Sequence, residues 1–189
     1  MTNAAGVRFT ERLRLEPIAA HHAGDLWRLH QDDRVAEWYA GRWSHERAAE
    51  MAESMGRQWA DDGVGKWIAY HRGTGDLVGR GGLSRTRILD RDELEIGWAI
   101  RDAWQRRGYA TEIGCAGLAF AFESLEATSV VAFTEVHNAA SRAVMTRLGM
   151  EYEGEFRLPG LIAGSAVVQD DASFALYRIR HPGLPRDRR

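Results

Sequence analysis

The sequence predicts an α+β (mixed α/β) fold, in which helices cover both faces of one mixed, mostly antiparallel sheet. Periodicity divides the chain into elements in the order β, α, α, β, β, β, α, β, α, β, β. Three consecutive strands with short connections indicate an antiparallel meander. A strand–helix–strand unit follows the meander, and such a unit requires a parallel crossover in the same sheet.

The first half of the chain contains four predicted strands and two predicted helices. Pro17 ends the first strand, and the run Arg72–Gly75 is typical of a hairpin turn between the second and third. The fourth strand alternates, with Ile96 and Trp98 on one face and Gly97 on the other. The strands are Leu13–Glu16, Lys66–His71, Asp76–Leu83 and Glu93–Ile100, the helices are Ala19–Arg34 and His45–Asp61, and an aromatic bend or loop covers Ala36–Trp43.

The second half contains the crossover and the closing strands. Tyr109–Leu125 is apolar almost all round, which predicts a well-buried helix. Gly149 stands where a left-handed cap would end the next helix. The remaining elements are the strand Ser129–Val136, the helix Ala139–Leu148, and the strands Tyr152–Leu158 and Ser173–Ile179.

Bulk properties favour one ordinary globular domain. We expect it to span residues 1–189, with a core over about 10–178 and a basic, flexible tail over 179–189. The net charge of −2 argues against a general attraction to nucleic acid or to an anionic membrane. Cys115 is the only cysteine, so an internal disulfide and a thiolate metal cluster are excluded. Met1–Thr10 lacks the apolar core of a signal peptide and no apolar stretch could span a membrane, so we expect a cytoplasmic protein.

One short run carries the strongest functional signal, and it opens the buried helix directly after the fourth strand. A glycine turn at a helix start leaves backbone N–H groups unpaired, and the positive end of the helix dipole adds to them. Such a turn binds phosphate or pyrophosphate, and two arginines inside it add positive charge. The run is Gln105-Arg106-Arg107-Gly108-Tyr109-Ala110-Thr111.

Three motifs in order resemble the GNAT superfamily of acyl-CoA-dependent N-acetyltransferases. The family's R/Q-x-x-G-x-G/A motif is matched at Gln105, Gly108 and Ala110. The family's second signature is an asparagine at the end of its fifth strand, followed by a helix that closes in Leu-Gly-Phe. It is similar to Asn138-Ala139-Ala140-Ser141 and Arg147-Leu148-Gly149-Met150. The opening, Thr10-Glu11-Arg12-Leu13-Arg14-Leu15-Glu16-Pro17, resembles the ribosomal-protein N-terminal (RimJ/RimL-like) acetyltransferase branch, and the whole resemblance covers residues 10–178.

The resemblance implies acetyl-CoA as co-substrate, no metal, and direct attack by an amine acceptor. It implies that the family's fourth and fifth strands splay apart to admit the pantetheine arm. The arm's amides would pair with the backbone of Trp98, Ala99 and Ile100, and the pyrophosphate would lie on the turn Gln105–Thr111. A backbone N–H of the fourth strand would then donate to the developing oxyanion.

Several residues are candidates for proton transfer. Glu95 is the first candidate for the base, acting through a water molecule, and His137 is the second. The tyrosine that many members use as acid falls on Met145, which cannot donate a proton. Ser141 is then the candidate hydrogen-bond partner of the coenzyme sulfur, although helix capping is equally open. Asn138 could contact coenzyme or acceptor, or act as the N-cap.

The acceptor is the least constrained part of the interpretation. An α-amine is substantially neutral near pH 7.5, whereas a lysine amine is neutral only about one part in a thousand, so an α-amine suits a weak set of bases. The acceptor could therefore be a protein N-terminus. The segment containing His30, Asp32, Trp38 and Tyr39 lies where the family places its acceptor wall, although these aromatics could equally be core.

Two alternatives remain open beside that interpretation, and two others are disfavoured. A small-molecule acetyltransferase for polyamines, amino acids or aminoglycosides is one, and a non-catalytic acetyl-CoA sensor, favoured by Met145, is another. A dinucleotide enzyme is disfavoured because Gly79–Gly82 lies in a strand with no helix after it. A metal hydrolase is disfavoured because His21 and His22 are adjacent.

A homodimer could form through exposed edge strands near the C-terminus.

Overall fold

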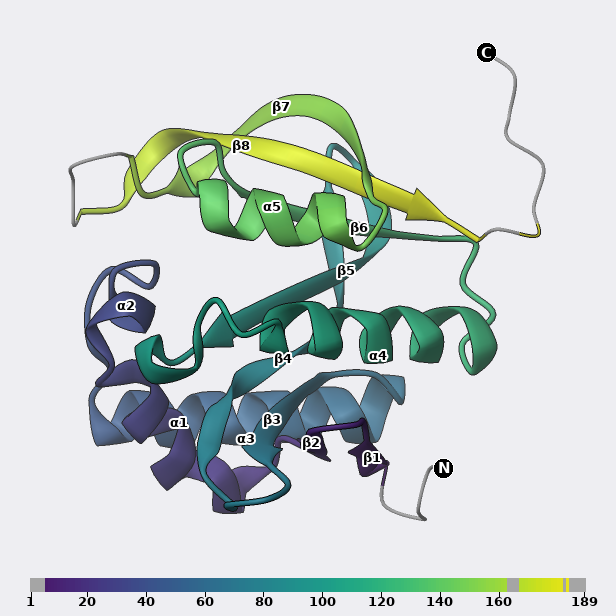
Figure 1. Ribbon diagram of the computed structural model, residues 1–189. Coiled ribbons are helices and arrows are strands. Elements are labelled where there is room, and N and C mark those ends of the chain that lie inside the picture. Colours follow the sequence, from purple (N-terminus) through teal and green to yellow (C-terminus); the bar gives the residue numbers. More distant parts are fainter. Residues whose placement is uncertain (1–5, 163–166, 182, 184–189) are drawn as a thin grey trace.

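The computed structural model describes residues 6–162, 167–181 and 183. Eight strands form one sheet in the order β1-β2-β3-β4-β5-β6-β8-β7 (Figure 1). The strands are β1 (Arg8–Phe9), β2 (Leu13–Pro17), β3 (Lys66–His71), β4 (Leu77–Ile88), β5 (Arg91–Ile100), β6 (Ser129–Glu135), β7 (Glu151–Gly160) and β8 (Gln169–Arg180). The helices are α1 (Ala23–His30), α2 (Asp33–Ala36), α3 (His45–Asp62), α4 (Tyr109–Glu123) and α5 (Ala139–Arg147), with 3-10 turns η1 (Ala20–His22) and η2 (Asp102–Trp104).

The sheet confirms the predicted class, because only β5 and β6 run parallel and every other pair is antiparallel. Helices cover both faces. In β3, Ile68 packs into the cluster formed with α1 and α3, whereas its neighbours Trp67 and Ala69 pack with Ile113 of α4. Adjacent residues of a strand point to opposite faces, so α4 lies across the sheet from α1 and α3.

The central strands separate, and this opens the sheet. The pairing of β5 with β6 is confined to one position, Glu95 opposite Val131. Beyond that position β5 continues for five residues, to Ile100, paired only with β4 on its other side. Figure 1 shows β5 and β6 diverging toward the N-terminal end of α4. The backbone of β5 therefore presents an unpaired edge inside the molecule.

A buried ion pair holds the strands together at the closed end of this opening. Arg178 of β8 donates two hydrogen bonds to Glu93 of β5, at 2.9 and 2.8 Å. The same guanidinium donates to Glu153 of β7 at 2.8 Å and to Ser129 of β6 at 3.2 Å. One side chain thus links four strands.

Two predicted boundaries were wrong for local reasons. The helix expected over Ala19–Arg34 is divided into η1, α1 and α2, because the Asp32 side chain accepts from the Arg34 N–H and begins a new helix. The strand expected to end at Leu83 continues to Ile88, and the strand expected to begin at Glu93 begins at Arg91. The two form one long hairpin, β4 and β5. Leu89 and Asp90 turn it with positive φ of 47° and 60°, the geometry of a type I′ turn, but they lack the usual Asn-Gly sequence.

The predicted tail over residues 179–189 begins too early. Strand β8 continues to Arg180, whose guanidinium donates to Glu153 at 2.7 Å. Residues 182 and 184–189 of the expected tail lie outside the described residues. Within the described part of the chain, no helix is long and apolar enough to cross a membrane.

Candidate active site

A cavity of about 880 Å³ lies where β5 and β6 diverge. Its wall is made by α2, the centre of the sheet, the turn before α4, and one side of α5 along its length. Most of the predicted coenzyme-binding residues line it, namely Trp98, Ala99, Ile100, Gln105, Arg106, Gly108, Tyr109, Ala110, Thr111, Asn138 and Ser141.

The turn before α4 presents a row of unpaired donors to this cavity. Among the described residues, the backbone N–H groups of residues 106–111 have no hydrogen-bond acceptor, and the Glu112 N–H is the first to donate, to the Gly108 carbonyl at 3.0 Å. Positive φ at Arg106 (58°) and Gly108 (84°) turns the chain into the helix. The Gln105 side chain closes the turn by donating to the Ile100 carbonyl at 3.0 Å. This arrangement has the unpaired donors and the helix start that the sequence analysis expects of an anion site.

Thr111 gives independent support for an anionic ligand here. Thr111 lines the cavity, and its buried hydroxyl has no hydrogen-bond partner in the described part of the chain. Because buried hydroxyls are normally paired, this group fits a ligand oxygen at the turn. The donor row and the orphaned hydroxyl together fit the pyrophosphate of acetyl-CoA, which supplies an activated acetyl thioester when bound.

Glu112, the acidic residue in the first turn of α4, is paired with Thr10 and Arg12 and not with the donors of the turn. Burial alone would raise the pKa of Glu112, but hydrogen bonds from Thr10 and Arg12 hold that pKa below its ordinary value. Arg12 also donates to the Arg107 carbonyl at 2.9 Å. The Arg107 guanidinium lies 5.7 Å from the ring centre of Trp104, and Arg107 alone of the predicted turn residues does not line the cavity.

Glu95 lies in the cavity wall within a charged network. Its Oε2 accepts from Lys66 Nζ at 2.7 Å and from the Ser84 hydroxyl at 2.8 Å. Burial lowers the pKa of Lys66, and the adjacent Glu95 carboxylate opposes this shift. Glu95 Oε1 accepts no hydrogen bond from the described residues, and a Cβ at Gly97 would stand 2.7 Å from it. Gly97 therefore keeps space open beside the carboxylate oxygen Oε1.

Asn138 and Ser141 lie in the same wall but have different local roles. The Asn138 side chain is the N-cap of α5, accepting from the Ser141 N–H at 3.1 Å and donating to the Thr134 hydroxyl at 3.1 Å. The Ser141 hydroxyl has no hydrogen-bond partner among the described residues, so it is available to a ligand. Met145 is 2 % exposed and lines the cavity beyond them.

The expected acceptor residues divide into two groups. Trp38 and Tyr39 line the cavity. His137, the second candidate base, is exposed and does not itself line the cavity, but its ring lies 5.2 Å from that of Trp38 at the cavity's edge. His30 is fully buried against Trp43, with ring centres 3.4 Å apart, and does not line the cavity. Burial, with a smaller contribution from the charge of Arg80, lowers the pKa of His30 to about 3.

Asp32 is also used structurally. One carboxylate oxygen accepts from the Arg34 N–H at 3.1 Å and the other accepts from the Asp102 N–H at 3.0 Å. Asp32 therefore joins α2 to the turn after β5 and does not reach the cavity wall.

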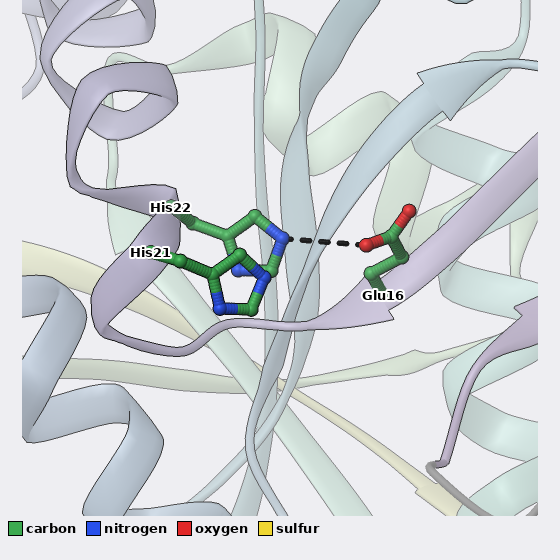
Figure 2. A group of neighbouring side chains, drawn as sticks. All are labelled: Glu16, His21 and His22. Carbon is green, nitrogen blue, oxygen red and sulfur yellow. Dashed lines mark hydrogen bonds and ion pairs between the residues drawn. The ribbon is translucent and has the colours of Figure 1, made fainter.

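Glu16, His21 and His22 form a cluster that sequence adjacency did not suggest (Figure 2). His22 Nδ1 accepts the Ala19 N–H at 3.1 Å, and His22 Nε2 faces Glu16 at 3.4 Å. Burial and the neighbouring His21 lower the pKa of His22, which favours the neutral ring. Because Nδ1 accepts the Ala19 N–H, the proton of a neutral ring lies on Nε2. Neither nitrogen of His22 then has a free lone pair for a metal ion. We assign this cluster to the packing of η1 against β2.

Sequence reasoning missed Lys66 and Arg80, two buried cations that line the cavity. Each is a charged residue in an otherwise apolar or glycine-rich strand. A charge in such a strand is unusual, and this could have indicated a functional residue from the sequence. The glycines beside Arg80 allow neighbouring backbone to approach closely, since a Cβ at Gly79 would stand 2.2 Å from the Ala99 carbonyl oxygen.

The family model described as acetyltransferase (GNAT) domain matches residues 12–151. The chain belongs to the GNAT acetyltransferase family. It is 28% identical over 156 residues to "Uncharacterized protein YkkB" of Bacillus subtilis, covering 82% of this chain and 91% of that protein. It is 25% identical over 150 residues to "Uncharacterized N-acetyltransferase YoaA" of the same organism, covering 78% and 84%.

The fold of this GNAT protein is shared with solved structures. The ribosomal-protein-S5-alanine acetyltransferase of Vibrio fischeri superposes with a TM-score of 0.76 at 14% identity, covering 94% of this chain and 97% of that one. The family transfers acetyl groups to amine acceptors and uses acetyl-CoA as co-substrate. Family membership confirms the resemblance drawn from the three sequence motifs.

Proposed function

We propose that this protein acetylates the α-amine of an acceptor, with Glu95 as the general base. One observation carries the proposal: Glu95 Oε1, free of hydrogen bonds among the described residues, shares a cavity with the open β5 edge and the donor turn before α4. The acceptor nitrogen forms a bond to the acetyl carbonyl carbon while the carbon–sulfur bond breaks. The amine proton passes through a water molecule to Glu95, and the sulfur leaves as a thiolate.

The other residues of the cavity bind and orient. The turn Gln105–Thr111 holds the pyrophosphate, and the unpaired edge of β5 at Trp98–Ile100 takes the pantetheine amides. A β5 N–H donates to the carbonyl oxygen as negative charge develops there. The Ser141 hydroxyl, free among the described residues, donates to the departing sulfur. His137, exposed at the rim, is the second candidate base.

The α-amine is favoured over a lysine amine by its basicity. Because the α-amine at a polypeptide end has a pKa of about 7.7–8.0, much of it is neutral near pH 7.5, and a single carboxylate acting through water suffices to take the proton that the nitrogen loses after attack. The α-amine of a free amino acid is more basic, but it remains less basic than a lysine side chain. A solved structure that shares this fold carries the description ribosomal-protein-S5-alanine acetyltransferase, which agrees with an amine at a polypeptide end. An amino acid is the alternative source of an α-amine.

The test combines coenzyme binding with transfer. We expect acetyl-CoA to raise the melting temperature, with NAD and ATP as controls, and thiol release to follow addition of α-amine acceptors. Replacing Glu95 with Gln should lower kcat by roughly 100-fold while leaving the Kd for acetyl-CoA unchanged. Ser84→Ala, which removes a neutral donor from the same carboxylate, is the matched control and should change kcat only a few-fold.

Two outcomes would contradict the proposal. Thermal stabilisation by acetyl-CoA without transfer to any amine would favour the non-catalytic sensor. Full activity of Glu95→Gln with an unchanged pH–rate profile would remove Glu95 as base and leave His137 to be tested.

A further inference from the structure

Arg80 is a buried arginine without an anionic partner. It is 6 % exposed, and none of the described residues forms an ion pair or a hydrogen bond with its side chain. Its Nε is fully buried and unpaired. The guanidinium lies over the ring of Tyr39, whose centre is 5.1 Å from the guanidinium carbon. An aromatic face attracts the charge but accepts no conventional hydrogen bond from the five N–H groups, so a partner is missing.

The side chain of Arg80 lies in the cavity wall on the same face of the sheet as Glu95. Arg80 is opposite Ala99 in the β4–β5 ladder, and alternation along β5 places Ala99 on one face with Glu95. The neighbouring Gly81 faces α4, because a Cβ there would stand 2.7 Å from Ile113. Arg80 therefore belongs to the face opposite α4 and is separate from the donors that begin that helix.

The charges around Arg80 do not neutralise it. Glu95 is already matched by Lys66 at 2.7 Å. Glu135, the other carboxylate of the wall, lies close to the Leu161 N–H and the Thr134 hydroxyl, at 3.4 Å from each. Among the described residues, the wall holds these two carboxylates and five cationic side chains: Arg34, Lys66, Arg80, Arg106 and Arg147. Arg106 belongs to the turn proposed to hold the pyrophosphate, whereas Arg80 lies apart from that turn, so its positive charge is left for an anionic group of the acceptor.

We propose that Arg80 binds a carboxylate of the acceptor, so that the substrate class is amino acids acetylated on the α-amine. This inference rests on the proposed function. The planar guanidinium matches a carboxylate through two parallel hydrogen bonds, which no amine-only acceptor can provide. A carboxylate bound at Arg80 would hold the molecule on the face that presents Glu95 to its amine. A peptide with an acidic first residue would present the same chemistry from a side chain.

The experiment compares acceptors that differ only in the acid group. Phenylalanine, phenylalaninamide and phenethylamine share a side chain, and a peptide pair beginning with Asp or Asn tests the side-chain source. We expect the wild-type enzyme to favour the carboxylate in kcat/KM by roughly 10- to 100-fold. Arg80→Met should remove that preference, mainly through KM, and leave the Kd for acetyl-CoA unchanged. Because the amines differ in pKa, the measured quantity is the change in each ratio between wild type and variant.

Two further variants complete the design. Arg85→Met removes an exposed arginine from the same strand, outside the cavity, and should keep the preference. Arg80→Lys keeps the charge but loses the two parallel guanidinium donors, so it should retain part of the preference for the carboxylate. If Arg80→Met does not fold, the wild-type series and Arg80→Lys decide the matter.

The outcomes separate the two proposals. If Arg80→Met keeps the wild-type ratios between phenylalanine, phenylalaninamide and phenethylamine at undiminished rates, the role of Arg80 is overturned and the proposed function stands. An equal loss for every acceptor in Arg80→Met would likewise overturn it, because that indicates a structural role. Preference for the Asp peptide over free phenylalanine would support carboxylate binding but overturn the amino acid as substrate. Transfer to no amine would overturn the proposed function itself, and this inference with it.

Discussion

At the scale of single residues, the first turn of α5 shows how two adjacent polar groups divide their tasks. The Asn138 side chain caps the helix and uses both its oxygen and its nitrogen within the protein. This capping releases the Ser141 hydroxyl, which faces the cavity with no hydrogen-bond partner among the described residues. Stability and ligand contact are thus assigned to different side chains three residues apart.

That division predicts opposite effects for two alanine variants. Ser141→Ala should slow turnover several-fold without changing the free energy of unfolding. Asn138→Ala should lower the free energy of unfolding by about 1 kcal/mol, because α5 loses its N-cap. Measurement of kcat and urea unfolding for both variants separates the roles. Destabilisation by Ser141→Ala with normal turnover would return the hydroxyl to a capping role.

His30 predicts a pH dependence of stability. In the folded protein its pKa is about 3, whereas the unfolded chain binds a proton near 6.5. The contribution of the neutral ring is therefore complete above pH 6.5 and is lost as the pH falls below that value. His30→Phe keeps an aromatic ring against Trp43 and removes the titration. Between pH 8 and pH 5 the free energy of unfolding of the wild type should fall by about 2 kcal/mol more than that of the variant, as measured by urea unfolding. Parallel stability curves would show that His30 accepts a proton in the folded state.

At the scale of elements, the turn and helix from Gln105 to Glu123 were the most predictable part of the site. Its donors depend on local sequence: a glycine at positive φ, a helix start, and no acceptor nearby. Arg80 and Lys66 were not predictable in the same way. Lys66 meets Glu95 from 29 residues away, and Arg80 reaches the cavity through its register with Ala99. Register between strands is a property of the assembled sheet, which periodicity along one strand does not contain.

The turn before α4 gives a prediction at this scale. Gly108→Asp should weaken acetyl-CoA binding by roughly 100-fold or more, because a carboxylate would stand among donors that face the pyrophosphate. Gly63→Asp is the matched control, since Gly63 also has positive φ (65°) and a Cβ there would meet nothing within 4 Å. Calorimetric titration of both variants measures the Kd. Retained affinity in Gly108→Asp would overturn the assignment of the turn.

At the scale of the whole molecule, the sheet depends on the link between its two halves. The predicted class, strand order of the meander and single parallel crossover followed from element order alone. The point at which β5 and β6 part did not, because it depends on the one pairing of Glu95 with Val131 and on Arg178 behind it. These contacts join segments that are distant in sequence.

Loss of that link should destabilise the molecule. Glu93→Gln leaves the buried Arg178 with one fewer carboxylate and should lower the free energy of unfolding by about 3 kcal/mol. The neighbouring Asp92→Asn removes an exposed pair with Arg87 and should change it by less than about 0.5 kcal/mol. Chemical denaturation compares the two variants. Equal effects would show that Glu93 contributes no more than a surface charge.

The separation of β5 from β6 also bears on how fast a ligand can enter. The folded chain already leaves the edge of β5 open after Glu95, so entry breaks no ladder between strands. Binding to such a preorganised edge avoids a slow opening step. Association of acetyl-CoA should then proceed in a single phase whose rate rises linearly with concentration, without the plateau that a preceding conformational change would impose.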